Sequence, residues 1–69
     1  IKKIKIRLNG KVKSIQQNTK LINLIKILKI PLKKVAIELN REIIDKKKLD
    51  KIVLKKGDKI EIVHFIGGG

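Results

Sequence analysis

The chain has 69 residues, a formal net charge of +13 and no cysteine. A domain of this size buries only about 60% of its unfolded surface, which favours a carrier or binding module over an enzyme with its own deep substrate cleft. The lack of cysteine excludes disulfides, thiolate metal sites and thiol nucleophiles, so any sulfur or acyl cargo must be held by something other than a side-chain thiol.

A half-buried strand and a hairpin turn are predicted at the start of the chain. Apolar and basic residues alternate there, with Ile4, Ile6 and Leu8 on one face and Lys3, Lys5 and Arg7 on the other. Asn9-Gly10 then favours the positive φ angles of a two-residue type I′ turn. We therefore expect a second strand from Lys11 to about Gln16.

A helix is predicted next, from about Thr19 to Ile30. Its apolar stripe has the spacing i, i+3, i+4, i+7 and consists of Leu21, Leu24, Ile25 and Leu28. Asn18 or Thr19 can cap the first turn by accepting a hydrogen bond from a backbone N–H. Pro31 disfavours helical geometry at the residue before it, so we expect it to end the helix.

A strand pair is predicted after the helix. Val35–Leu39 is apolar on both faces apart from Glu38, which suits a central position in a sheet. Asn40-Arg41 is the expected turn into a short return strand over residues 42–44. Arg41 is a poor residue for this turn because it resists positive φ more than Gly does.

The last third of the chain predicts a short helical segment and a final strand. Asp45 can cap a helical turn over residues 46–51, with Leu49 and Ile52 pointing inward. Gly57-Asp58 marks a tight turn. The final strand is expected from Lys59 to Ile66, with alternate residues on opposite faces.

This order of elements resembles the ubiquitin-like β-grasp, an α+β fold in which a mixed four- to five-stranded sheet packs on one main helix. We expect the first and last strands to be central neighbours, the domain to span residues 1–66 and a flexible tail to span residues 67–69. The face without a helix should carry Lys3, Lys5, Arg7, Val63 and Phe65. Because Val63, Phe65 and Ile66 are apolar and precede the tail, we expect them to bind a partner.

The sequence ends in Gly67-Gly68-Gly69. Glycine has no Cβ, so such a segment can pass through a channel too narrow for side chains. We expect Gly67 and Gly68 to thread into a partner enzyme and the α-carboxylate of Gly69 to be the modified group, since a carboxylate accepts a nucleophile once it is activated as an acyl adenylate. The alternative is a frayed terminus without a function.

Other reactive chemistry is not indicated. His64 is the one histidine in the sequence, and without cysteine or a second histidine it does not predict a zinc site. Neither a phosphate-binding loop signature nor a dinucleotide fingerprint occurs. We therefore predict no catalytic residue, no metal and no bound cofactor, and the lack of a long apolar run predicts a soluble protein of the cytoplasm without membrane contact.

Four segments together look like one known family: residues 35–40, the turn Gly57-Asp58, the strand at residues 60–63 and the end from Phe65 to Gly69. They resemble the ThiS family, the sulfur carriers of thiamine biosynthesis. The resemblance covers essentially the whole chain. It departs from the family at Arg41, where Gly is frequent, and at Asp45, where Pro is frequent.

The resemblance implies a route for the sulfur. A ubiquitin-activating-type adenylating enzyme, similar to ThiF, would use ATP to convert the Gly69 carboxylate to an acyl adenylate. A persulfide donor would supply sulfur, which leaves a thiocarboxylate, and a thiazole synthase similar to ThiG would take the sulfur from it. The carrier itself would be a co-substrate of these partners and no enzyme.

Two alternatives share features with this interpretation. A molybdopterin-type sulfur carrier or a ubiquitin-like protein modifier has the same fold and the same Gly-Gly end, although the former is usually longer and tends to carry Pro before its final glycines. A basic RNA-binding module would explain the charge. Only Arg7 and Arg41 of the 19 basic residues are Arg, however, and Phe65 is the one aromatic residue, so the composition disfavours nucleic-acid recognition.

Overall fold

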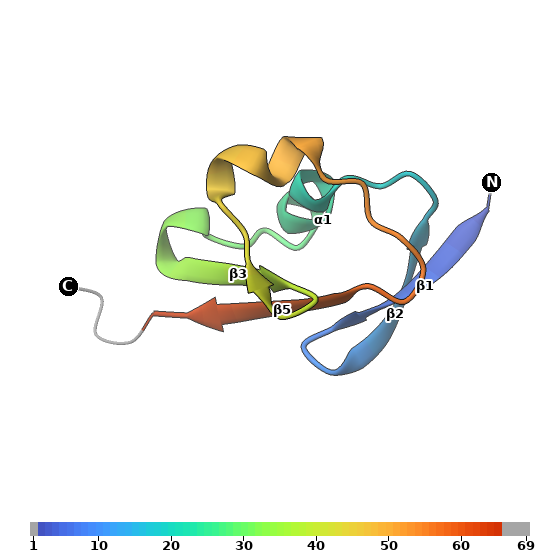
Figure 1. Ribbon diagram of the computed structural model, residues 1–69, viewed down its shortest axis with the longest axis horizontal. Helices are drawn as coiled ribbons and strands as arrows, with labels where there is room; N and C mark the ends of the chain where they lie inside the picture. Colours follow the sequence, from blue (N-terminus) through green and yellow to red (C-terminus); the bar gives the residue numbers. More distant parts are fainter. Residues whose placement is uncertain (1, 66–69) are drawn as a thin grey trace.

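The computed structural model describes residues 2–65, which form a five-stranded sheet with helical elements over one of its faces (Figure 1). The strands are β1 (Lys3–Leu8), β2 (Lys11–Gln16), β3 (Val35–Leu39), β4 (Glu42–Ile43) and β5 (Lys59–His64). The helical elements are α1 (Leu21–Ile27) and the two 3₁₀ segments η1 (Leu32–Lys34) and η2 (Lys46–Lys51).

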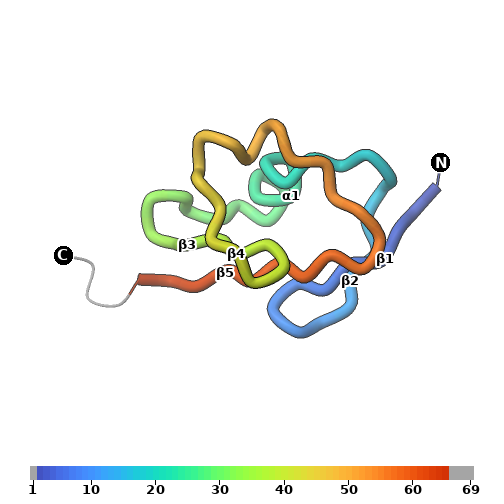
Figure 2. The backbone as a smooth tube through the Cα atoms, in the orientation of Figure 1, coloured from blue at the N-terminus to red at the C-terminus, as the bar shows by residue number. Residues whose placement is uncertain are grey.

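The strand order is β2-β1-β5-β3-β4, with β5 in the middle of the sheet. β1 and β5 run parallel to each other, whereas the pairs β1–β2, β3–β4 and β3–β5 are antiparallel. The path of the chain in Figure 2 places η2 and α1 on the same side of this sheet. The predicted mixed sheet, its single main helix and the pairing of the first and last strands are therefore confirmed.

Both predicted two-residue turns form. Asn9 and Gly10 have φ angles of 49° and 81°, and Asn40 and Arg41 have φ angles of 50° and 72°. Two successive positive φ angles are the mark of a type I′ turn, which matches the twist of the strands that it joins. Arg41 thus adopts the left-handed conformation that its side chain disfavours.

The helix is shorter than predicted. α1 begins at Leu21, and Lys20 occupies the N-cap position without a side-chain hydrogen bond. Neither Asn18 nor Thr19 is the cap: Asn18 has a φ of 69°, and the hydroxyl of Thr19 donates to the carbonyl of Gln16 at 2.7 Å. The chain therefore makes a turn at Asn18 and Thr19, which were predicted to cap the first turn of the helix.

The C-terminal end of α1 is a Schellman motif rather than a stop at Pro31. Lys29 has a φ of 56° and donates to the carbonyl of Lys26 at 3.1 Å, while Ile30 donates to the carbonyl of Ile25 at 3.2 Å. These two bonds satisfy carbonyls at the end of the helix, the usual task of a Gly in the left-handed position. Pro31 follows after the chain has already left the helix.

The core lies between the sheet and the helical layer. Its buried apolar side chains come from every large element: Ile6, Ile15, Leu21, Leu24, Ile25, Val35, Ile37, Leu49, Leu54, Ile60 and Ile62. The alternation in β1 and β5 and the stripe on α1 thus face the same interior, as the sequence predicted. Asp45 accepts a hydrogen bond from the backbone N–H of Lys47 at 2.9 Å and caps η2, which buries Leu49 and packs Ile52 against the core.

The last strand ends two residues earlier than predicted. β5 stops at His64, and residue 66 lies outside the described part of the chain. Among residues 2–65, no helix is long and apolar enough to cross a membrane.

Candidate functional site

The central strand β5 leads directly toward the C-terminal glycines. It pairs with β1 on one side and with β3 on the other, and the N–H of Phe65 extends the second ladder by donating to the carbonyl of Lys34 at 2.9 Å. The chain is therefore held by the sheet up to its last described residue. The predicted roles of Ile66, Gly67, Gly68 and Gly69 lie outside the described residues.

Asn9 anchors β5 from the first hairpin. Its Oδ1 accepts a hydrogen bond from the N–H of Ile62 at 2.7 Å, and its Nδ2 donates to the carbonyl of Ile62 at 3.5 Å. The side-chain amide thus continues the β1–β5 ladder beyond the point where the backbone of β1 turns away. The sequence predicted only a turn at Asn9, and its side-chain amide was the available signal of this second role.

Asn40 makes an equivalent contact from the second hairpin. Its Oδ1 accepts from the N–H of Lys59 at 2.9 Å, and its Nδ2 donates to Asp58 Oδ1 at 3.1 Å. The other oxygen of Asp58 accepts from the N–H of Lys55 at 2.8 Å. The start of β5 is therefore fixed by side chains from two turns, which makes this strand a rigid base for the segment that follows it.

The open face of the sheet, the face opposite α1, carries exposed apolar side chains next to the end of β5. Val63 is 48% exposed and lies opposite Ala36 on β3, and Ile43 on β4 is 75% exposed. Glu38 on β3 pairs with Ile43 on one side and with Glu61 on the other, and Glu61 precedes Val63 by two residues on β5. Ile43 was missed by the sequence analysis because its face depends on the register of a two-residue strand.

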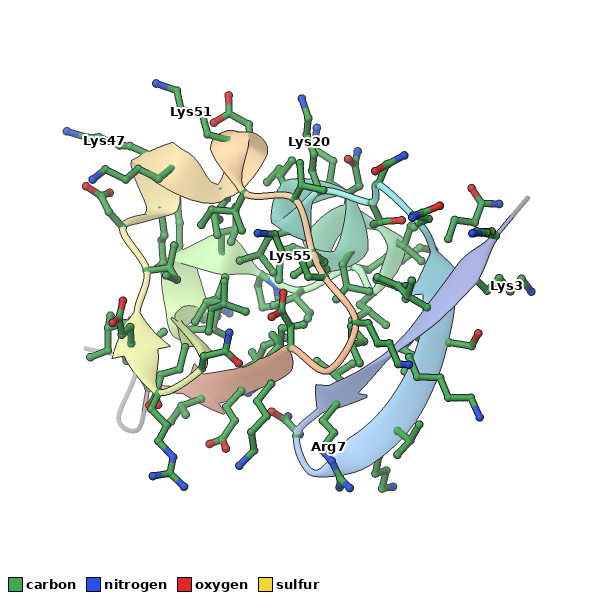
Figure 3. All side chains as sticks on the ribbon, turned by 45° about the vertical axis from the view of Figure 1, so that its right-hand side comes forward. Lys3, Arg7, Lys20, Lys47, Lys51 and Lys55 are labelled. Atoms are coloured by element: carbon green, nitrogen blue, oxygen red, sulfur yellow. The ribbon has the colours of Figure 1, made fainter. Side chains whose placement is uncertain are left out.

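The other half of the open face is basic. Lys3, Lys5 and Arg7 alternate with the inward-facing residues of β1, as predicted, and Arg7 lies beside Lys59 on β5. Figure 3 shows Arg7 extending from the sheet, whereas Lys47 and Lys51 extend from η2 on the opposite side of the molecule. The open face is thus divided into an apolar half with two carboxylates and a cationic half.

Phe65 lies where the open face meets the η2 side. Its ring is 58% exposed, and the ammonium group of Lys46 lies 5.5 Å from the ring centroid. Lys46 also donates to the carbonyl of Leu32, so the first residue of η2 bridges the ring and the η1 segment. The sequence placed Phe65 on the open face beside Val63; the structure instead gives its ring a contact with an element of the covered side.

The described residues offer few ligands for a metal. Within residues 2–65, no group of three or more His, Cys, Asp or Glu side chains is arranged to hold an ion. His64 is exposed at the end of β5. The described site is therefore the strand β5, which is fixed by its neighbours and has exposed apolar side chains beside its C-terminal end.

Comparison with known proteins agrees with this arrangement. A family model described as the ThiS family matches residues 6–69. The chain is 40% identical over 65 residues to the sulfur carrier protein ThiS of Bacillus subtilis, a match that covers 93% of this chain and 98% of that protein. It is also similar in structure to the thiamine biosynthesis protein ThiS of Geobacter metallireducens, with a TM-score of 0.84 and 29% identity over 96% of this chain and 100% of that one.

Two longer proteins are also similar to this chain. It is 39% identical over 66 residues to a thiazole synthase of Magnetococcus marinus and 36% identical over 66 residues to one of Paramagnetospirillum magneticum. The match covers 96% of this chain in both cases. The chain spans 20% of the length of each of these two relatives.

Proposed function

The chain belongs to the ThiS family, and from this membership we propose that it is a sulfur carrier protein of thiamine biosynthesis. The single observation that carries the proposal is the extent of the match, which runs from residue 6 through the three glycines at residues 67–69. The protein is then a co-substrate of its partner enzymes and not a catalyst. The absence of cysteine supports the terminal carboxylate as the place of the cargo.

The proposed cargo site is the α-carboxylate of Gly69. An adenylating enzyme transfers AMP from ATP to this carboxylate and releases pyrophosphate, which turns a poor acyl acceptor into a reactive mixed anhydride. The terminal sulfur of a persulfide then displaces AMP. Cleavage of the resulting S–S bond by a thiol leaves the thiocarboxylate on Gly69.

The sheet supports this chemistry by fixing the base of the tail. Five extended residues, from Phe65 to Gly69, span at most about 17 Å, enough to enter a buried active site while the domain stays outside. Ordering each backbone residue costs roughly 1–2 kcal/mol, so docking of the domain must offset several kcal/mol. β5 itself is already ordered by its pairing with β3 through His64 and by the hydrogen bond from the N–H of Phe65 to the carbonyl of Lys34, so the ordering cost does not include this strand.

The apolar half of the open face is the proposed docking surface for the adenylating enzyme. Val63 and Ile43 are exposed there, and Phe65 borders it. Removing apolar surface from water contributes about 25 cal/mol per Å², so a few such side chains offset part of the ordering cost of the tail. Glu38 and Glu61 add negative charge to this surface in a protein that is otherwise basic.

The proposed acceptor of the sulfur is a thiazole synthase. The two relatives with that name contain a segment similar to this chain within a longer protein, which supports a close functional association of the two parts. A persulfide donor and a separate adenylating enzyme similar to ThiF complete the proposed set of partners.

Transfer to the acceptor tests the proposal. The protein in its thiocarboxylate form is mixed with a thiazole synthase and the other thiazole precursors, and the product is followed by liquid chromatography with mass detection. We expect thiazole to form with one equivalent of sulfur consumed per carrier. Thiocarboxylate that persists here but is consumed by a molybdopterin synthase would instead assign the chain to that pathway.

A further inference from the structure

Strand β2 is a free edge of the sheet. It pairs with β1 and with no other strand of residues 2–65. The hairpin closes on the pair Leu8–Lys11, and in a two-residue hairpin the closing residues exchange their backbone hydrogen bonds. The N–H and C=O groups of Val12 and Ser14 therefore point away from β1, toward the side where another strand could pair.

An apolar hollow of about 290 Å³ runs along this edge, between β2 and α1. Its floor is formed by Ile15 and Leu24, and Ile27 stands at its rim with 70% of its surface exposed. Lys13 and Gln16 line the β2 side. This volume is at the lower limit of small-molecule pockets, which suits one or two aliphatic side chains of a peptide better than a whole ligand.

The elements around the hollow carry positive charge only. No Asp or Glu precedes Glu38 in the sequence, whereas eleven Lys and Arg residues do. Eight of these eleven residues lie in β1, β2, α1 and η1, while all six acidic residues belong to the segment from Glu38 onward. The net charge is thus concentrated on the part of the chain that forms the free edge and the helix beside it.

We propose that the β2 edge binds an extended segment of a partner protein in which alternating aliphatic residues are flanked by Asp or Glu. The segment pairs with the free backbone groups of Val12 and Ser14 as a sixth strand. Its inward side chains fill the hollow against Ile15 and Leu24, and its acidic residues face Lys11 and Lys13. Strand addition of this kind draws affinity from backbone bonds and specificity from pockets for alternate side chains.

The same charges exclude a second copy of this chain as the occupant. Lysines on an edge strand protect a sheet against pairing with itself, because two copies would bring like charges together. A segment with Asp or Glu has no such repulsion, because its carboxylates are attracted to the lysines of β2. The site also differs from the proposed docking surface, since β2 and α1 lie away from the C-terminal end of β5 (Figure 1). It can therefore be occupied while the tail is engaged, and it does not depend on the sulfur carrier function.

A synthetic peptide tests the proposal on the intact protein. The probe carries alternating Val and Ile between two Asp pairs; one control replaces Asp with Lys, and a second places Pro at the centre to prevent strand pairing. Amide and methyl NMR shifts are followed during titration. We expect saturable shifts at residues 12–16 and at Leu24 and Ile27, with a Kd below about 1 mM, and no saturation with either control peptide.

Matched variants locate the site. Ile27→Gln should weaken binding of the acidic peptide about tenfold, whereas Ile43→Gln, at an equally exposed isoleucine on β4, should leave it unchanged. Lys13→Gln should weaken binding more than Lys47→Gln, which removes the same charge from η2. Raising the ionic strength from about 0.01 M to about 1 M should weaken binding, because it shortens the Debye length about tenfold.

Three results would overturn the proposal. They are shifts confined to other elements, equal losses in the paired variants, and equal binding of the Lys-flanked peptide. A short oligouridylate is titrated in parallel as an RNA probe, with the same NMR measurement. Saturable binding of the RNA to β1 and β2 without binding of the acidic peptide would assign the charge to nucleic acid and would also contradict the proposal.

Discussion

Two asparagines show how single residues hold the strand that carries the tail. Asn9 and Asn40 both take positive φ angles at the first position of a turn, and both use their side-chain oxygen to accept a backbone N–H of β5. Asparagine is tolerated in the left-handed region and offers an amide that imitates the backbone. At both positions asparagine therefore has two roles: it adopts the backbone conformation of the turn, and its side chain hydrogen-bonds to β5.

Replacing Asn9 by Gly isolates the second of these roles. Gly keeps the positive φ but loses both hydrogen bonds to Ile62, so we expect a loss of about 1–2 kcal/mol in the free energy of unfolding. Asn18→Gly is the matched control, because Asn18 also has a positive φ. Urea unfolding that shows equal losses for the two variants would contradict the role of the Asn9 amide.

Arg41 is the opposite case, a residue whose backbone is strained. At a φ of 72° it lies in the region that a Cβ disfavours, so Arg41→Gly should raise the free energy of unfolding by about 0.5–1 kcal/mol. The gain is limited because Gly also makes the unfolded chain more flexible. Thermal unfolding checks the change, and a lower melting temperature for the variant would show that Arg41 makes stabilising contacts that outweigh the strain.

At the scale of elements, α1 contributes three of the buried side chains that cover the sheet. Leu21, Leu24 and Ile25 are each at most 1% exposed, and η2 packs against the same helix. A helix of seven residues is too short to be stable in isolation, so its packing on the sheet is what maintains it.

Leu24→Ala tests that packing. The substitution removes a buried side chain from the helix and leaves a cavity, which should cost about 2–5 kcal/mol. This is a large share of the stability of a small domain. The exposed Lys26 on the same helix is the matched control, and Lys26→Ala should change the free energy of unfolding by less than about 0.5 kcal/mol. An unchanged melting temperature for Leu24→Ala would mean that α1 does not pack as described.

Element types could be predicted from the sequence, while several ends and faces could not. The stripe on α1, the alternation in β1 and β5 and the two turn dipeptides are local patterns, and each led to the right element. The Schellman end at Lys29 could not be predicted because it places lysine where glycine is usual. The contact between Phe65 and Lys46 joins residues far apart in the sequence, and the face of Ile43 depends on the β3–β4 register.

At the scale of the whole molecule, we propose that the domain provides a rigid base for its C-terminal residues. The central strand β5 contacts both hairpins, through Asn9 and Asn40, and the open face beside it carries apolar and charged side chains. Family membership could be predicted from the sequence because the terminal glycines and the segments around β3 and β5 are local motifs. Val63 and Phe65 of the proposed docking surface were also expected from the sequence, whereas the face of Ile43 depends on the register between β3 and β4.

Phe65→Ala tests the docking role of the whole surface. Loss of the ring should weaken binding of the adenylating enzyme more than it lowers the melting temperature, because the ring is 58% exposed and contributes little to the core. Val63→Ser should act in the same direction, and Val12→Ser, on the far strand of the same face, is the matched control. Calorimetry that gives equal affinities for Phe65→Ala, Val63→Ser and the unchanged protein would contradict the surface assignment.

The most direct test of the central claim is the intact mass of the protein after reaction. The chain is incubated with its adenylating enzyme, ATP and a persulfide donor, and its mass is followed over time. We expect the exchange of one oxygen for sulfur, located at Gly69 by fragmentation, and a far slower exchange when Gly69 is deleted, because a misplacement of even 1 Å at a reacting centre can cost about 100-fold in rate. Sulfur on an internal residue, or exchange at full rate in the truncated protein, would contradict the account.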